Sequence, residues 1–208
     1  IARKESAAPG DEPRFIALSR DITERKQAEA RSHQLAYFDA LTGLPNRRML
    51  LDRMEHALAN AQKAAQVGAV LYIDLDHFKQ INDQHGHAMG DAVLCRVSSL
   101  LAQHMRTSDL CCRYGGEEFC VVLRNCASLG EVLTFAEQLR NKIQSLRVKV
   151  RRTDQVLDSI TASFGCALAE NGDTFESLLT RADDALYRAK RAGRNQVHPA
   201  ISEAIVSA

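Results

Sequence analysis

The sequence predicts a mixed α/β fold, with helices packed on the faces of a mixed central sheet. Apolar residues at helical spacing alternate along the chain with short runs rich in β-branched residues. Two hairpins are also expected, one across Gly115 and Gly116 and one across residues 151–156. The 208 residues, of which 45% are hydrophobic, suffice for one main core and a short extension. Together these observations favour a layered α/β domain.

The beginning of the chain is expected to lie outside this core. Residues 14–29 are typical of a short strand followed by a polar helix, and the helical stretch covers residues 22–38. Because that helix has only a weak heptad seam, its pairing with a second copy is a hypothesis that rests on its position. Residues 1–13 contain two prolines and charges of both signs, so a loose tail is the alternative for them.

Four helices are expected in the core, each with an apolar stripe at helical spacing. The stripes contain Leu51, Met54, Leu58 and Ala61; Leu94, Val97 and Leu101; Val132, Phe135, Leu139, Ile143 and Leu146; and Phe175, Leu178, Ala182, Leu186 and Ala189. The second helix is expected to follow Asp91, and the fourth to be capped near Asp173 and to stop at Gly193. A central strand is expected from residues 67–68 onward, and a buried strand over residues 159–168.

Two acidic residues follow the Gly-Gly pair. Glu117 and Glu118 come directly before the apolar run 119–123, so the sequence presents acid at a tight turn between two strands. Carboxylate oxygens are the ligands that Mg²⁺ prefers. For this motif alone, the alternative is an ordinary hairpin with a solvated acidic tip.

A second acidic site ends the apolar strand over residues 70–73. Asp74 and Asp76 follow that strand with Leu75 between them, and Lys79 comes three residues later. A buried strand holds its terminal ligands rigidly, and its end opens into a crevice. Amide, imidazole, glycine and carboxylate groups then gather in residues 81–91. Carboxylates from two sequence-distant strands, joined by cations, suit a Mg²⁺-dependent nucleotidyl transfer.

Other classes of protein are disfavoured. The sequence has neither a P-loop motif nor a Gly-x-Gly-x-x-Gly motif, which argues against P-loop enzymes and hydride-transferring enzymes. The net charge of +1 argues against binding of a nucleic-acid polymer. Six cysteines without a Cys-x-x-Cys pair are expected to be free thiols in a reducing cytosol. Because no apolar run has the length of a membrane span and the N-terminus does not resemble a signal peptide, a cytoplasmic protein without membrane contact is expected.

These motifs closely resemble the GGDEF family of diguanylate cyclases, in its GGEEF variant. The resemblance covers about residues 39–197 and includes residues 39–47, 74–79, 82–91 and 185–195 beside the acidic signature. It implies the palm-like fold shared with nucleotidyl cyclases and polymerases. The implied organisation is the C-terminal end of a PAS sensor domain over residues 1–20, its linker helix over 21–38, the cyclase domain over 39–199 and a tail over 200–208.

The resemblance implies a role for each matching residue. The implied metal ligands are Asp74, the backbone carbonyl of Leu75 and Glu117; the catalytic residues are Glu117, Glu118 and Lys79; and the substrate-binding residues are Asn82, His87, Asp91, Gly115, Gly116, Lys190 and Arg194. Asn82 and Asp91 would read guanine by hydrogen bonds, and Lys190 and Arg194 would contact the triphosphate. The alternative for Asp91 and for the two C-terminal cations is a place favoured by a helix dipole.

The implied reaction condenses two GTP into cyclic di-GMP and releases two pyrophosphates, with Mg²⁺ or, alternatively, Mn²⁺ as cofactor. Each domain would bind one GTP, so the implied enzyme is a homodimer of half-sites, controlled in the full-length chain by an upstream sensor domain. Arg106 and Asp109 resemble the family's product-inhibition site, at which cyclic di-GMP binds. Gln138 stands where many members carry a second arginine, with Arg140 two residues on, so weaker inhibition is expected.

Two other functions stay open. One is a non-catalytic module that binds GTP or cyclic di-GMP and regulates a partner; the presence of both signature acids, Asp74 and Lys79 argues for catalysis instead. The other is an adenylate or guanylate cyclase of the same fold. Asn82 and Asp91 favour guanine as the base.

Overall fold

The computed structural model describes residues 2–4, 15–17, 22–61, 68–149, 156–157, 159–170 and 172–201. The chain divides into two compact units, residues 1–36 and residues 37–208. In the first unit, β1 (Ala2–Lys4) pairs antiparallel with β2 (Phe15–Ala17). The helix α1 (Thr23–Tyr37) then runs to the boundary between the units.

The second unit is built around one five-stranded sheet with the order β4-β5-β3-β8-β9. Its strands are β3 (Gly68–Leu75), β4 (Leu110–Gly115), β5 (Glu118–Arg124), β8 (Ala162–Leu168) and β9 (Val197–Pro199). All neighbours are antiparallel except β8 and β9, which run parallel, so the sheet is mixed as predicted. A separate ribbon pairs β6 (Val148–Lys149) with β7 (Val156–Leu157), and the residues expected to turn between them lie outside the described part.

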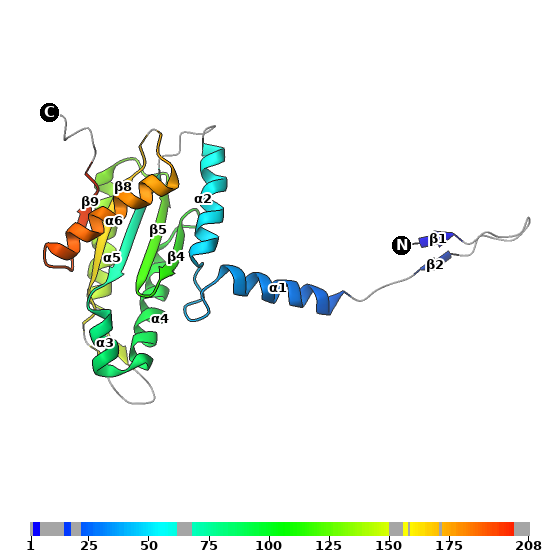
Figure 1. Ribbon diagram of the computed structural model, residues 1–208, viewed down its shortest axis with the longest axis horizontal. Coiled ribbons are helices and arrows are strands. Elements are labelled where there is room, and N and C mark those ends of the chain that lie inside the picture. Colours follow the sequence, from blue (N-terminus) through cyan, green and yellow to red (C-terminus); the bar gives the residue numbers. More distant parts are fainter. Residues whose placement is uncertain are drawn as a thin grey trace, which may run out of the picture. The chain divides into compact units, whose positions relative to one another are not determined.

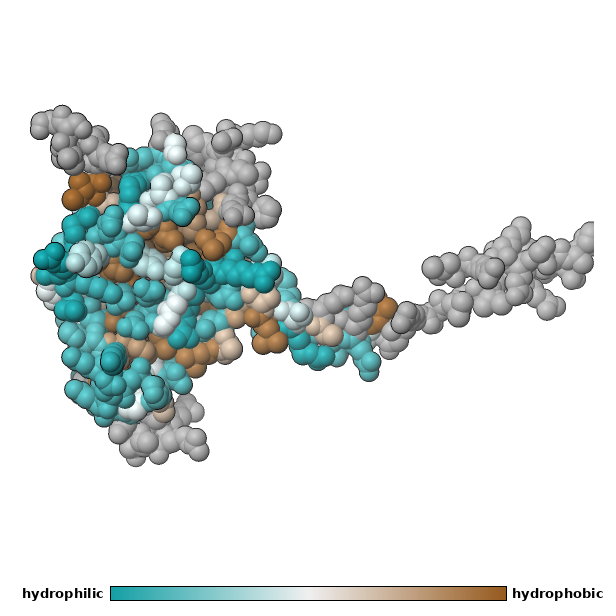
Figure 2. All heavy atoms as spheres, viewed as in Figure 1, coloured by the Kyte–Doolittle hydropathy of each residue, from teal (hydrophilic) through white to brown (hydrophobic). Residues whose placement is uncertain are grey.

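Helices cover both faces of this sheet (Figure 1). They are α2 (Arg47–Ala61), α3 (Phe78–His85), α4 (His87–His104), α5 (Leu129–Gln144) and α6 (Phe175–Arg191). Because side chains alternate along a strand, β3 serves both faces. Leu71 and Ile73 pack in the core that includes residues of α4 and α5, whereas Val70 and Tyr72 pack with residues of α2 and α6. The view in Figure 2 shows a mostly hydrophilic outer face on this unit.

The helix α6 packs very closely on β8. Its start is fixed by a capping box, in which Thr174 Oγ1 accepts from the Ser177 N–H at 3.1 Å and Ser177 Oγ accepts from the Thr174 N–H at 3.0 Å. Gly165 of β8 permits the close approach, because a Cβ at that position would lie 2.0 Å from the Ala182 carbonyl oxygen. This packing brings the C-terminal end of α6 to the end of β3.

The prediction that the second core helix starts after Asp91 is wrong. The helix α4 begins at His87 and contains Asp91, and the separate helix α3 precedes it. Phe78 and Ile81 are buried three residues apart, which stabilises a short helix over residues for which the sequence analysis predicted no helix. Gly86, with φ of +81°, separates the two helices.

The other three expected core helices correspond to α2, α5 and α6. Among the described residues, no helix combines the length and the apolar character that crossing a bilayer requires.

Candidate functional site

The two acidic segments meet at one end of the sheet, where the end of β3 lies beside the start of β5. In the β3–β5 ladder, Asp74 lies directly opposite Glu118. The Leu75 N–H donates to the Glu117 carbonyl oxygen at 3.3 Å. Residues directly opposite each other in an antiparallel pair share one face of the sheet. Acids that are more than forty residues apart in the sequence therefore lie side by side.

The Gly-Gly segment forms the turn of the hairpin made by β4 and β5, which we call the signature hairpin (Leu110–Arg124). Gly116 has φ of +28°, a region that favours glycine. The register shifts between Arg113 and Gly115, so the hairpin carries a bulge just before its turn. Arg113 stabilises the turn, because its Nε and Nη2 donate to the Gly116 carbonyl oxygen at 3.0 and 2.8 Å.

Lys190 of α6 and Arg194, in the loop after that helix, add positive charge to this cluster. Lys190 Nζ lies 2.8 Å from Asp74 Oδ2. Burial raises the pKa of the Asp74 carboxyl above its usual range, opposed by the hydrogen bond and charge of Lys190 and by Arg194. Burial also raises the pKa of the Glu117 carboxyl, and the charge of Asp74 raises it further, while Lys190 lowers it. The two half-buried or buried acids would therefore be stabilised by an added cation.

Asp76 anchors the loop that follows α6. It is 4% exposed, and its two carboxylate oxygens accept from Ser163 Oγ at 2.7 Å and from the Asn195 N–H at 3.0 Å. Arg194 and Asn195 both have positive φ, at +65° and +48°, so the chain turns sharply here. The anchor thereby fixes the segment that carries Arg194 next to the strand ends. The sequence analysis assigned no role to Asp76.

The residues expected to read guanine lie on α3 and α4. Asn82 packs against the first turn of α4, where a Cβ on Gly90 would lie 2.0 Å from Asn82 Oδ1. Because Gly90 has no side chain, the amide of Asn82 occupies the space beside it. Gly90 directly precedes Asp91, so Asn82 lies close to the backbone next to Asp91. His87, the first residue of α4, and Lys79 of α3 are exposed.

The residues expected to bind the inhibitory product lie in the loop between α4 and β4. Asp109 Oδ2 accepts from the Arg106 N–H at 3.0 Å, and Asp109 Oδ1 accepts from the Arg124 N–H at 3.2 Å. The carboxylate of Asp109 thus already closes the loop, while Arg106 is exposed. On α5, Gln138 is exposed, whereas the guanidinium of Arg140 bonds to Glu137 and Asn195, each at 2.8 Å.

Oxygen donors suited to Mg²⁺ are present at the end of β3. In the described part of the chain, no three side chains of His, Cys, Asp or Glu converge as a metal site. Two carboxylates and a backbone carbonyl are nevertheless a common donor set for Mg²⁺, which takes its remaining ligands from water and substrate phosphates. The raised pKa values of Asp74 and Glu117 fit such a cation. Asp74, Glu117 and the Leu75 carbonyl are thus compatible with the predicted metal site.

Two polar contacts at the signature hairpin were missed by the sequence analysis. Asp39 accepts from the Thr42 N–H at 2.8 Å and from Arg113 Nη1 at 3.0 Å, which joins the segment before α2 to the hairpin. Tyr72 Oη donates to Glu118 Oε2 at 3.3 Å. A signal existed for Tyr72, since it is a hydroxyl-bearing residue in an otherwise apolar strand, two residues before Asp74.

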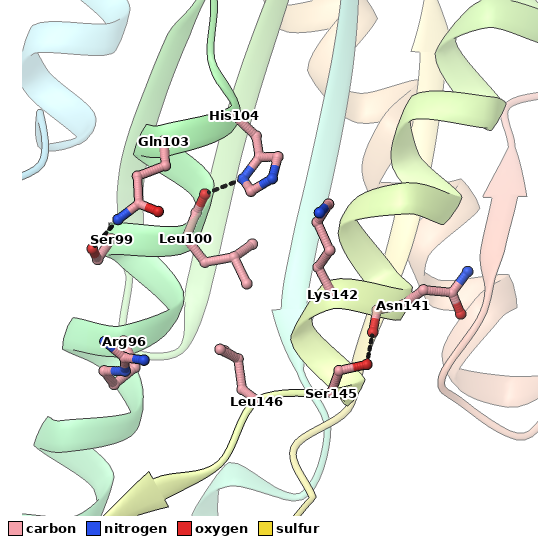
Figure 3. Close-up of a pocket in the computed structure, with 9 residues that line it drawn as sticks. All are labelled: Arg96, Ser99, Leu100, Gln103, His104, Asn141, Lys142, Ser145 and Leu146. Carbon is pink, nitrogen blue, oxygen red and sulfur yellow. Dashed lines mark hydrogen bonds between the residues drawn. The ribbon is translucent and has the colours of Figure 1, made fainter.

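Two of the hollows on the surface of this unit are lined by described residues. One, of about 610 Å³, adjoins the signature turn and is lined by Arg47, Arg48, Gly115 and Gly116, among others. The other, of about 480 Å³, is a groove between α4 and α5 with Arg96 and Lys142 on its rims (Figure 3). The second groove is lined by none of the predicted site residues.

A mixed sheet covered by helices, with acids at adjacent strand ends and cations from a facing helix, defines a class of α/β domains suited to handling nucleotides. Within that class, this chain belongs to the family described as diguanylate cyclase, GGDEF domain, whose sequence model matches residues 36–196.

Named relatives agree with this membership. The chain is 40% identical to diguanylate cyclase VdcA of Vibrio cholerae over 183 residues, which are 88% of this chain and 52% of the relative. It is 38% identical to diguanylate cyclase DgcM of Escherichia coli, again over 88% of this chain and 43% of the relative. The chain thus spans about half the length of these curated relatives.

A solved structure agrees as well. The coiled coil and GGDEF domain of DgcB from Caulobacter crescentus, in complex with c-di-GMP, superposes with a TM-score of 0.81 at 33% identity, covering 86% of this chain and 93% of that one. The predicted mixed α/β fold is therefore confirmed.

Proposed function

We propose that residues 39–199 form a diguanylate cyclase domain, which condenses two GTP into cyclic di-GMP and releases two pyrophosphates. The observation that carries this proposal is the meeting of Asp74 with the Glu117–Glu118 segment, with Lys190 Nζ 2.8 Å from Asp74. The names of VdcA and DgcM and the cyclic di-GMP bound to DgcB support it.

In this proposal, Asp74, the Leu75 carbonyl and Glu117 hold Mg²⁺, or alternatively Mn²⁺. The metal, when bound, lowers the pKa of the attacking hydroxyl and offsets charge on the phosphates. Glu118 acts as helper or general base near the attacking hydroxyl. Lys190, whose Nζ lies 2.8 Å from Asp74 Oδ2, would be the cation that contacts the triphosphate. Lys79 and Arg194 are further cations for the phosphates.

Guanine recognition is proposed for the pair Asn82 and Asp91, with His87 near the same nucleotide and Gly115 and Gly116 close to the phosphates. A carboxylate and an amide oxygen accept hydrogen bonds from the guanine N1 and N2 edge, which adenine does not offer. The close packing of Asn82 on Gly90 supports a fixed position for this pair.

The proposed active form is a symmetric dimer. The 3′-hydroxyl of each nucleotide attacks the α-phosphate of the other, so two copies must face each other about a two-fold axis. We propose that residues 1–20 are the C-terminal end of a PAS sensor domain, with the linker helix over 21–38. The unit boundary between residues 36 and 37 supports a division at this point. The linker could then set the orientation of the half-sites.

Product inhibition is proposed at Arg106 and Asp109. Arginine is suited to phosphate and to the guanine face, and aspartate to the guanine edge. Gln138 and the engaged guanidinium of Arg140 support only weak inhibition. A titration of activity with cyclic di-GMP tests the site, since Arg106→Ala should shift the inhibition curve to higher product concentration. Equal inhibition curves for wild type and Arg106→Ala would show that cyclic di-GMP does not inhibit through Arg106.

The decisive experiment is incubation of the purified chain with GTP or ATP plus Mg²⁺, followed by identification of the product. Cyclic di-GMP is expected as the product with GTP, and no cyclic dinucleotide is expected with ATP. Glu117→Gln should lower the formation of cyclic di-GMP by about 100-fold or more, because a metal ligand is lost. The matched control is Glu176→Gln, the same change at an exposed position of α6. A wild-type rate in Glu117→Gln, or binding of GTP without turnover in the wild type, would contradict the proposal.

A further inference from the structure

Tyr72 brings a hydroxyl group into the buried face of β3. The residue is 6% exposed and packs in the apolar cluster shared with α2 and α6. A buried tyrosine hydroxyl normally has a hydrogen-bond partner, and here Oη donates to Glu118 Oε2 at 3.3 Å. A phenylalanine would fill the same space, so packing alone does not require the hydroxyl.

The strand register places this hydroxyl at the candidate site. Tyr72 lies opposite Cys120, and Asp74 lies opposite Glu118, so Tyr72 and Glu118 are diagonal neighbours. Residues two apart on a strand point to the same face, and an aromatic side chain reaches across the diagonal. The hydrogen bond therefore joins β3, which carries Asp74, to the first residue of β5.

The surroundings keep Tyr72 a donor. Burial raises the pKa of its hydroxyl far above the ordinary value, and the charge of Glu118 raises it further. Tyr114 and Asp183 act in the same direction. The raised pKa agrees with the geometry of the contact, in which the Tyr72 hydroxyl donates to Glu118 Oε2 at 3.3 Å.

Two further side chains support the ring of Tyr72. The ring of Tyr114 meets it edge to face, with the centroids 5.3 Å apart and an angle of 80° between the planes. The guanidinium of Arg47 lies 4.9 Å from the centroid of the Tyr114 ring. Edge-to-face pairs and cation–π contacts are both stabilising, so the ring has little freedom to move the hydroxyl away.

We propose that Tyr72 is a positioning residue for the reaction, whose hydroxyl fixes the Glu118 carboxylate beside Asp74. The inference rests on the proposed function, in which Glu118 assists the attacking hydroxyl. Because this assistance operates in the transition state and not in binding of the nucleotide, loss of the Tyr72 hydroxyl lowers kcat and leaves KM for GTP nearly unchanged.

The first test is steady-state kinetics of Tyr72→Phe with GTP and Mg²⁺. The expected result is a kcat about 5- to 20-fold lower, with KM within about two-fold. This loss is at or below the low end for one hydrogen bond to a charged group, because the contact of 3.3 Å is long. Tyr187→Phe is the matched control, because Tyr187 is 60% exposed on α6, and both of its constants should stay within about two-fold of wild type. A wild-type kcat in Tyr72→Phe overturns the proposal.

The second test needs no turnover. Urea unfolding of wild type, Tyr72→Phe, Glu118→Ala and the double variant forms a cycle that isolates the coupling between the two side chains. A favourable coupling is expected, and strictly additive effects overturn the proposal even if the protein is active. A wild type that makes no cyclic di-GMP defeats the proposed function instead, and the cycle still decides whether Tyr72 holds Glu118.

Discussion

Glu117 illustrates at the residue scale how a functional group can cost stability. Its carboxyl has a raised pKa, mainly because of burial and then because of Asp74. Above that pKa the folded state must carry a charge that the unfolded state carries more easily. The contribution of Glu117 to stability therefore falls as the pH rises through its folded-state pKa.

Glu117→Gln is accordingly expected to unfold at a higher temperature than wild type at pH 7 in metal-free buffer. The difference should vanish as the pH falls below the ordinary pKa of 4.5, where the Glu117 carboxyl of wild type is protonated in both the folded and the unfolded state. Calorimetry from pH 3 to pH 8 checks this. Addition of Mg²⁺ should raise the melting temperature of wild type more than that of the variant, because bound ligand stabilises the folded state. A destabilised variant at pH 7 would show that the site does not repel charge.

The pKa of the Asp39 carboxyl is shifted in the opposite direction to that of Glu117. Burial alone would raise the pKa of its carboxyl, but hydrogen bonds from Thr42 and Arg113 outweigh burial and lower it. A lowered pKa means that the ionised carboxylate stabilises the fold above the ordinary pKa, and that this stability is lost as the pH falls through the folded-state pKa. Since Arg113 also braces the Gly116 carbonyl, Asp39 supports the signature turn indirectly.

Asp39→Asn should lower the free energy of unfolding by about 1 to 2 kcal/mol at pH 7, toward the low end for a hydrogen bond to a charged group because the Asp39 side chain is partly exposed. The gap to wild type should narrow below the ordinary pKa of 3.8, because wild type then loses the same charge. Urea unfolding at pH 7 and pH 3 measures both effects. Asp184→Asn, at an exposed position of α6, is the control and should change little at either pH. A gap that is constant with pH would rule out the charge as its cause.

At the element scale, the position of α6 depends on one glycine. Gly165 lies under the backbone of α6, where a Cβ would come within 2.0 Å of the Ala182 carbonyl oxygen and 2.3 Å of the Leu186 nitrogen. These are backbone atoms of a helix, so they yield only if α6 moves as a whole. The same helix carries Lys190 to Asp74.

Gly165→Ala is therefore expected to cost about 2 to 3 kcal/mol of stability through overpacking, and to lower activity as well. Gly130→Ala is a matched control, because that glycine lies in the first turn of α5 and its Cβ would lie in ordinary contact with Ser128 Oγ at 3.8 Å. This control should be neutral or more stable by up to about 1 kcal/mol, since alanine favours helix. Urea unfolding and GTP turnover distinguish the two. Equal stability of both variants would mean that α6 can shift freely.

The element scale also shows what sequence reasoning could reach. Regular apolar spacing and capping residues such as Thr174 are local signals, so α2, α5 and α6 were predicted. The helix α3 was missed because it is only eight residues long and rich in polar side chains. The pairing of Asp74 with the signature turn came from the family resemblance. Contacts such as Tyr72 with Glu118 depend on strand register across 46 residues, and no local pattern encodes register.

At the scale of the whole molecule, the proposed chemistry needs two copies. Both hydrophobic clusters of buried residues lie within the second unit, so each copy of that unit has its own core. One copy binds one GTP in the proposed mechanism and completes only one of the two new phosphodiester bonds. Activity per protomer should therefore fall on dilution well below the dimer dissociation constant. Constant activity per protomer over such a dilution would contradict the half-site arrangement.

Mixing wild type with Glu117→Gln tests the same dependence more sharply. If subunits exchange at random, equal amounts give one quarter wild-type dimers, and only these complete both bonds. Activity per total protein should then be about one quarter of wild type, whereas an enzyme that acts as a monomer would give about one half. The measurement is cyclic di-GMP formed at constant total protein, after incubation long enough for exchange. Glu176→Gln mixed in the same ratio should leave the rate unchanged, which separates the loss of a site acid from an effect of mixing.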